Sequence, residues 1–104
     1  MPIGGRELSP FAQRVLDVVE SIPVGRVMAY GDIAEYLGEA GPRNVGAVMA
    51  HWGGPVPWWR VLRADGSPPP GHVSAALEHY RAEATPLRAG GQRVDMRRAR
   101  WDGR

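Results

Sequence analysis

The stretch GDIAEYLG-EAG-PRNVGAVMAHWG, residues 31–53, decides the fold. Its first part places apolar residues at helical spacing up to Gly38, which predicts a short helix that ends at this glycine. Pro42 suits the first turn of the next helix, because the N–H that proline lacks has no intrahelical partner there. Two short helices joined by a glycine-containing turn are typical of a helix-turn-helix. The expected buried stripes are Ile33, Ala34 and Leu37 on the first helix and Val45, Val48, Met49 and Trp52 on the second.

Upstream of this stretch, Ser9 and Pro10 form a helix-start signal. The serine hydroxyl can cap the first turn, and proline is favoured at the first helical position. Apolar residues then recur at helical spacing, which predicts an amphipathic helix from Pro10 to Ser21 that Pro23 ends. The expected buried residues of this helix are Phe11, Val15, Val18, Val19 and Ile22.

Downstream, the residues from Trp59 to Arg63 alternate as a strand would, and the ADG sequence that follows favours a turn. The proline-rich run Ser67–His72 is predicted to be a loop. A helix should extend from Val73 to about Glu83, and a short strand should lie around Arg93–Met96. Helix, helix-turn-helix, hairpin-like wing and further helix together predict a mainly α fold with a small β component, a winged helix-turn-helix.

The chain length of 104 residues supports one modest core. We expect a single winged-helix DNA-binding domain over residues 1–104, with its core at about 8–87 and an arginine-rich C-terminal tail at 88–104. The chain has no lysine, and six of its 13 arginines lie in this tail. A basic tail can contact nucleic acid phosphates, and a solvated, partly disordered end is the equal alternative.

The absence of cysteine excludes a disulfide framework, a thiolate metal site and a cysteine nucleophile. The sequence has no HExxH motif, no phosphate-binding glycine loop and no closely spaced acidic pair, so we expect neither a metal nor another cofactor. It also has no apolar run long enough for a membrane span and no secretion signal at its start. We therefore expect a soluble cytoplasmic protein that does not bind membranes.

Four motifs follow one another along the chain: IPVGRVMAYGDIAEYLG, PRNVGAVM, PVPWWRVL and AALEHYRAEATPL. Their order resembles the DNA-binding, active-site domain of the O6-alkylguanine-DNA alkyltransferases, with its IPxGxVxSYGxLAxxxG, ARAVGxAM and PCHRV patterns and a helix ending in LLxxEG. The resemblance extends from about Phe11 to Leu87. Trp58 stands where that family has its alkyl-accepting cysteine, and Trp59 where it has the histidine that relays the proton. Because an indole lacks the nucleophilicity of a thiolate, the chain resembles the alkyltransferase-like proteins, in which tryptophan commonly replaces the cysteine.

This resemblance implies a non-enzymatic sensor of DNA damage. Such a protein would bind duplex DNA at O6-alkylguanine, turn the damaged base into a pocket and mark the lesion for nucleotide excision repair proteins. We expect it to act as a monomer associated with the nucleoid. Two other functions remain open: a winged-helix transcription regulator that recognises a defined operator, and a residual enzyme that uses Glu83 as a general acid or base.

The resemblance also implies roles for single residues. Tyr30 matches a tyrosine that pushes on the phosphate beside the target nucleotide, and the alternative is a core tyrosine. Arg43 matches an arginine that enters the duplex where the base left, and the alternative is an ordinary phosphate contact. Trp58 should form the pocket floor. The expected DNA-binding residues are Tyr30, Arg43, Asn44, Gly46 and Ala47, and the expected lesion pocket consists of Tyr30, Met49, Trp58 and Val61.

The neighbours of Trp58 are expected to support the fold. Strand alternation predicts that Trp59 points away from Trp58 and packs inside the domain. Arg60 is expected to be a buried brace. Glu83 matches the glutamate at the far end of the family's proton relay, has lost both relay partners, and is expected to satisfy nearby backbone or arginine groups. The loop Ser67–His72 should border the mouth of the pocket.

Overall fold

In the computed structural model, which describes residues 8–104, the Ser9–Pro10 pair begins helix α1 (Pro10–Ser21). The Ser9 hydroxyl oxygen accepts a hydrogen bond from the Ala12 N–H at 3.0 Å, and the helix ends where the backbone of Ile22 becomes extended. These bounds confirm the helix predicted from the capping signal. The buried residues of α1 are Ala12, Val15, Val18 and Val19, and Phe11 is only partly buried.

The helix-turn-helix consists of α2 (Tyr30–Leu37) and α3 (Pro42–Trp52), which pack against each other and against α1. Gly38 ends α2 with a φ of 72°, a left-handed conformation that glycine adopts without steric cost. At the start of α3, the Asn44 side chain accepts a hydrogen bond from the Gly41 N–H at 3.1 Å. The prediction of two short helices joined by a tight turn is confirmed.

A two-stranded parallel sheet joins the helix-turn-helix to the centre of the molecule. Strand β1 (Met28–Ala29) lies immediately before α2, and it pairs with β2 (Val61–Leu62). The prediction of a strand from Trp59 to Arg63 is wrong at its start, because Trp58–Arg60 forms a 3-10 turn, η1. Strand β2 pairs in parallel with β1 and not with a strand beyond the ADG turn. The predicted mainly α fold with a small β component is confirmed.

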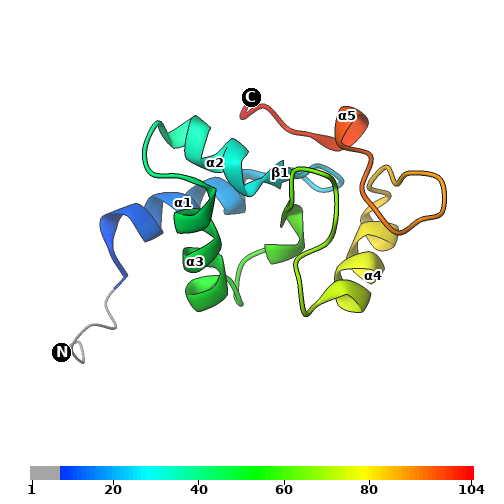
Figure 1. Ribbon diagram of the computed structural model, residues 1–104, viewed down its shortest axis with the longest axis horizontal. Coiled ribbons are helices and arrows are strands. Elements are labelled where there is room, and N and C mark those ends of the chain that lie inside the picture. Colours follow the sequence, from blue (N-terminus) through cyan, green and yellow to red (C-terminus); the bar gives the residue numbers. More distant parts are fainter. Residues whose placement is uncertain (1–7) are drawn as a thin grey trace.

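Beyond β2, a loop leads to α4 (Val73–Glu83), whose bounds agree with the predicted helix. Figure 1 shows α1, α2 and α3 on one side of the molecule, α4 on the other, and the segment from η1 to α4 between them. The first apolar cluster lies among α1, α2 and α3, and Val61 belongs to it. The second cluster contains Val27, Leu62, Ala76, Leu77, Tyr80, Val94 and Ala99.

The C-terminal segment, residues 88–104, is part of the folded structure. Val94 and Ala99 are fully buried, so the core extends beyond the expected limit at residue 87. The Trp101 N–H donates to the Val27 carbonyl at 2.8 Å, and a single parallel bridge joins Val27 to Arg100. The alternative of a solvated, partly disordered end is therefore wrong.

The predicted strand around Arg93–Met96 is also wrong, because this segment has one antiparallel bridge, Leu87 to Val94, and then enters α5 (Met96–Ala99). The chain runs from α5 over the molecule toward α2 (Figure 1). Arg100 there forms an ion pair with Asp32 at 3.0 Å.

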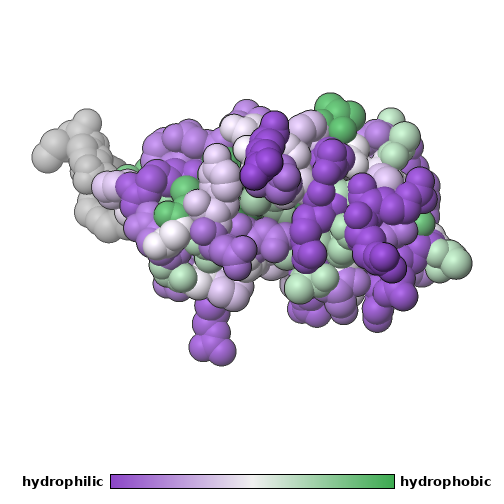
Figure 2. Space-filling model, turned by 90° about the horizontal axis from the view of Figure 1, so that it is seen from above, coloured by the Kyte–Doolittle hydropathy of each residue, from purple (hydrophilic) through white to green (hydrophobic). Residues whose placement is uncertain are grey.

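The surface over this C-terminal segment is largely hydrophilic, with hydrophobic side chains in small separate groups (Figure 2). Exposed arginines of this segment contribute to it, including Arg97 and Arg98 of α5. Across residues 8–104, none of the helices combines the length and apolar character that crossing a bilayer requires.

Candidate functional site

A cavity of about 630 Å³ lies between α3 and the segment that leads from η1 to α4. Its volume is within the range of about 300–1,000 Å³ that is typical of sites for small organic ligands. The expected pocket residues Tyr30, Met49, Trp58 and Val61 all line it, although they come from four different elements. The other lining residues are Gly46, Ala50, Gly53, Gly54, Arg63, Pro69, Pro70 and His72.

Helix α3 presents the remaining candidate residues for DNA contact. Gly46 lines the cavity, and a Cβ built on it would meet no other heavy atom within 4 Å, so this part of the helix surface is open. Arg43 and Ala47 are exposed. Asn44 is exposed as well, but its side-chain oxygen already accepts the Gly41 N–H. These placements are compatible with the predicted contacts, which stay predictions.

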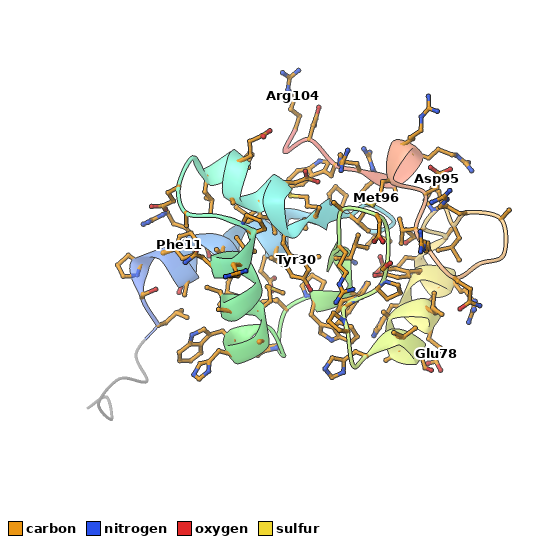
Figure 3. All side chains as sticks on the ribbon, viewed as in Figure 1. Phe11, Tyr30, Glu78, Asp95, Met96 and Arg104 are labelled. Carbon is orange, nitrogen blue, oxygen red and sulfur yellow. The ribbon has the colours of Figure 1, made fainter. Side chains whose placement is uncertain are left out.

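Tyr30 lies at the junction of β1 and α2, next to the cavity. It lies in the middle of the molecule, between α3 and the segment that follows η1, whereas Glu78 points outward from α4 (Figure 3). Burial raises the pKa of the Tyr30 phenol, and the positive charge of Arg63 opposes this effect in part. Because its pKa is raised, Tyr30 keeps its proton at neutral pH and can donate a hydrogen bond.

Three aromatic rings surround Trp58. The Trp58 ring is edge-on to Trp59 at a centroid distance of 5.6 Å and edge-on to His79 at 5.8 Å, and it is tilted against His72 at 5.5 Å. Such edge-on contacts are favourable, and they restrict rotation of the indole. The fold therefore holds Trp58 at the wall of the cavity.

Trp59 packs away from the cavity, against α4. Its ring stacks on His79 with a centroid distance of 3.6 Å and an interplanar angle of 3°. Its indole N–H donates to Glu83 Oε2 at 2.8 Å. The expected packing role is confirmed, but the reason given for it is wrong, since the two tryptophans diverge within a 3-10 turn and not along a strand.

Glu83 accepts two hydrogen bonds on each carboxylate oxygen. The Gly25 N–H and Arg60 Nε donate to Oε1, each at 3.1 Å. Trp59 Nε1 and the Arg60 terminal nitrogen donate to Oε2 at 2.8 and 2.7 Å. Burial alone would raise the pKa of Glu83, but these hydrogen bonds, first those from Arg60, lower it below its usual value.

The expected role of Glu83, as an acid that satisfies nearby backbone and arginine groups, is therefore confirmed. The Trp59 indole N–H is one of the donors to this carboxylate. Arg60 also donates to the Ile22 carbonyl at 2.9 Å, which confirms its role as a brace between α1 and α4, although its side chain is largely and not fully buried.

Four lining residues were not predicted from the sequence: Ala50, Gly53, Gly54 and the charged Arg63. Residues two apart in a strand face the same side. Because Val61 was expected to line the pocket, the predicted strand could also have placed Arg63 there. The loop Ser67–His72 was expected at the mouth of the pocket, and Pro69, Pro70 and His72 do line the cavity. Within residues 8–104 there is no group of three or more histidine, aspartate or glutamate side chains arranged to hold a metal ion.

Comparisons with known proteins agree with this fold. Residues 10–85 match the family model described as "6-O-methylguanine DNA methyltransferase, DNA binding domain". The chain is 34% identical over 102 residues to the DNA base-flipping protein of Escherichia coli, covering 88% of this chain and 74% of that protein. It is 38% identical over 77 residues to alkyltransferase-like protein 1 of Schizosaccharomyces pombe, covering 71% of each chain.

Solved structures agree as well. S. pombe Atl1 in complex with damaged DNA containing O6-carboxymethylguanine superposes with a TM-score of 0.72 at 30% identity, covering 88% of this chain and 94% of that one. A variant of the M. tuberculosis O6-methylguanine methyltransferase gives a TM-score of 0.63 at 29% identity, covering 79% of this chain and 54% of that one. The chain belongs to the family of the 6-O-methylguanine DNA methyltransferase DNA-binding domain, and within it to the alkyltransferase-like proteins.

Proposed function

We propose that this protein is a non-enzymatic sensor that binds duplex DNA at O6-alkylguanine and holds the damaged base in the cavity beside Trp58. The observation that carries the proposal is the wall of this cavity, which is mostly apolar and aromatic and lies beside the exposed face of α3. A cavity of this kind suits a flat, neutral ligand such as a base turned out of the duplex.

Recognition would depend on the balance between extruding the base and holding it. Extrusion costs a few kcal/mol, and least for a pair that damage has already weakened. Stacking on an aromatic side chain such as Trp58 contributes about 1–3 kcal/mol per base. Arg43 would fill the gap in the duplex, because a planar guanidinium can both stack and donate hydrogen bonds in a fixed geometry. Tyr30, with its proton retained, would donate to the adjacent phosphate.

Two features support binding without alkyl transfer. The 104 residues contain no cysteine to accept the alkyl group. Glu83, which could otherwise serve as a general base, already accepts two hydrogen bonds on each oxygen and has a lowered pKa. A carboxylate held in this way is a poor proton acceptor at neutral pH.

The name of one relative and the bound DNA in the structure of another support the proposal. The E. coli relative is named a DNA base-flipping protein, and the S. pombe relative was solved with damaged DNA. A sensor that leaves the lesion in place requires other proteins to remove it, and we propose that those are nucleotide excision repair proteins. The proposal places the protein, as a monomer, on DNA in the cytoplasm.

A titration of two duplexes that differ only in one O6-methyl group tests this function. At fixed salt, we expect the O6-methylguanine duplex to bind about 10-fold more tightly than the guanine duplex, which corresponds to about 1.4 kcal/mol. Trp58→Ala should remove most of this preference, since stacking is its main source. Trp101→Ala, a tryptophan change outside the cavity, is the matched control and should keep the preference.

Equal affinities of the wild-type protein for the two duplexes would refute the proposal. Mass analysis of protein and DNA after incubation separates binding from chemistry. We expect the masses of the protein and of the DNA to stay unchanged. Transfer of the methyl group to the protein, or its loss from the base, would show that the protein is an enzyme.

A further inference from the structure

Among residues 8–104, Arg63 is the one arginine that lines the cavity, and the other lining residues are glycine, apolar or aromatic, with His72 among the aromatic ones. A guanidinium stays charged at any pH at which the protein is folded. Arg63 is exposed, so solvent screens its charge in part, while the apolar wall of the cavity lies next to it. The cavity is therefore asymmetric, neutral over most of its wall and positive at Arg63.

In the described part of the chain, no ion pair neutralises the charge of Arg63. The ion pairs within residues 8–104 are Arg14–Glu39, Arg60–Glu83 and Arg100–Asp32, so none of them includes Arg63. Asp65 is nearby, but its carboxylate accepts a hydrogen bond from the Ser67 N–H at 2.9 Å. Its pKa is lowered mainly by its hydrogen bonds to Ser67 and only to a smaller extent by the charges of Arg93 and Arg63. The Arg63 guanidinium is thus available to a ligand.

The charge also acts across the cavity. Arg63 opposes the effect of burial on the pKa of Tyr30, which lines the same cavity. A group that occupies the space between Tyr30 and Arg63 would experience the same positive potential. Neutral O6-alkyl groups gain little from such a potential, whereas a carboxylate gains a charge-assisted hydrogen bond and can be held by both arms of the guanidinium.

We propose that Arg63 makes the cavity selective for O6-substituents of guanine that carry a carboxylate over neutral substituents of the same size. This inference rests on the function proposed above, because it concerns the lesion that the cavity would take. Arg63 would act on the substituent, while Trp58 stacks on the base itself. Selectivity among lesions and selectivity for a lesion over guanine would thus reside in different residues.

The experiment compares duplexes that contain O6-carboxymethylguanine or its neutral amide, O6-carbamoylmethylguanine. The two substituents have nearly the same size and differ by one charge. At fixed salt, we expect the wild-type protein to bind the carboxymethyl duplex about 5-fold more tightly, as for a partly exposed charge-assisted hydrogen bond. Arg63→Gln should reduce this ratio to about one, because it removes the charge that favours the carboxylate. Arg81→Gln changes an exposed arginine on α4 outside the cavity, and it should leave the ratio unchanged.

Two outcomes would overturn the inference alone. In the first, the wild-type protein binds both substituted duplexes equally while it still prefers them to guanine. In the second, Arg63→Gln weakens every duplex by the same factor and keeps the ratio, which would show a phosphate contact. If the wild-type protein prefers neither lesion to guanine, the proposed function fails and this inference fails with it.

Discussion

The two tryptophans of the η1 turn lie next to each other in the sequence but belong to two different regions. Trp58 lines a cavity, and its ring contacts come from other aromatic rings. Trp59 lies in a hydrogen-bonded network with Arg60 and Glu83, in which both carboxylate oxygens are fully used. The cavity region leaves surface for a ligand, whereas the network region leaves none.

Residues that stabilise the fold and residues that would bind a ligand therefore lie next to each other in the sequence. Buried polar groups stabilise a fold when all their hydrogen bonds are made, and the network around Glu83 meets this condition. A mostly apolar and aromatic wall with a few polar groups, such as Tyr30 and Arg63, is instead suited to binding a ligand. Changes in the network should therefore alter unfolding, and changes at the cavity should alter binding.

The largest expected effect is the loss of the network. Glu83→Ala leaves the Arg60 charge without its partner at a site where both side chains are only 12% exposed. Removing one partner of a largely buried pair costs about 3–5 kcal/mol. Urea unfolding followed by circular dichroism measures this loss. Glu78→Ala, on the outward side of α4, is the control and should change stability by less than about 0.5 kcal/mol. A loss below 1 kcal/mol for Glu83→Ala would show that the network is not what stabilises the fold.

A smaller effect, on binding alone, is expected at the exposed face of α3. Arg43→Ala should weaken binding to the lesion duplex by about 2 kcal/mol, roughly 30-fold, as for a residue that inserts at the centre of an interface. Its free energy of unfolding should stay within about 0.5 kcal/mol of wild type, because Arg43 is exposed. Titration and urea unfolding of the same preparation check both values. If Arg43→Ala lowered the free energy of unfolding but left the affinity unchanged, Arg43 would support the fold and would not contact DNA.

The pH dependence of stability offers a finer test of the network. Because the pKa of Glu83 is lower in the folded protein than its usual value of 4.5, the ionised carboxylate stabilises the fold above this pH. The contribution is lost as the pH falls through the lower, folded-state pKa. We expect the stability difference between wild type and Glu83→Gln to be constant from pH 7 to about 5 and to shrink below pH 4.5. A difference that does not change with pH would contradict an ionised, hydrogen-bonded Glu83.

Local signals were sufficient to predict much of this fold. The Ser9–Pro10 pair, Gly38 and Pro42 act within one helical turn, so the helices they begin or end were predicted close to their observed bounds. The cavity residues followed from a resemblance that covers most of the chain. The four expected ones, Tyr30 among them, do line one cavity, although their contacts with DNA stay predictions.

Contacts between distant residues could not be predicted in this way. The 3-10 turn at Trp58–Arg60 is held by Glu83, which lies more than 20 residues away in the sequence. Val94 and Ala99 are buried because they reach Gly66 and Val27, and the many arginines around them hide this apolar pattern. The C-terminal segment was therefore taken for a tail although it completes the core.

The central claim is that Trp58 contacts the damaged base while Trp59 only supports the fold. Fluorine NMR of protein labelled with 5-fluorotryptophan tests it directly, with the Trp58 and Trp59 signals assigned from Trp58→Phe and Trp59→Phe. We predict that the Trp58 signal shifts on binding an O6-methylguanine duplex and shifts much less on binding the guanine duplex, while the Trp59 signal stays in place with both. Equal shifts of Trp58 with the two duplexes, or a lesion-dependent shift of Trp59 as large as that of Trp58, would contradict the claim.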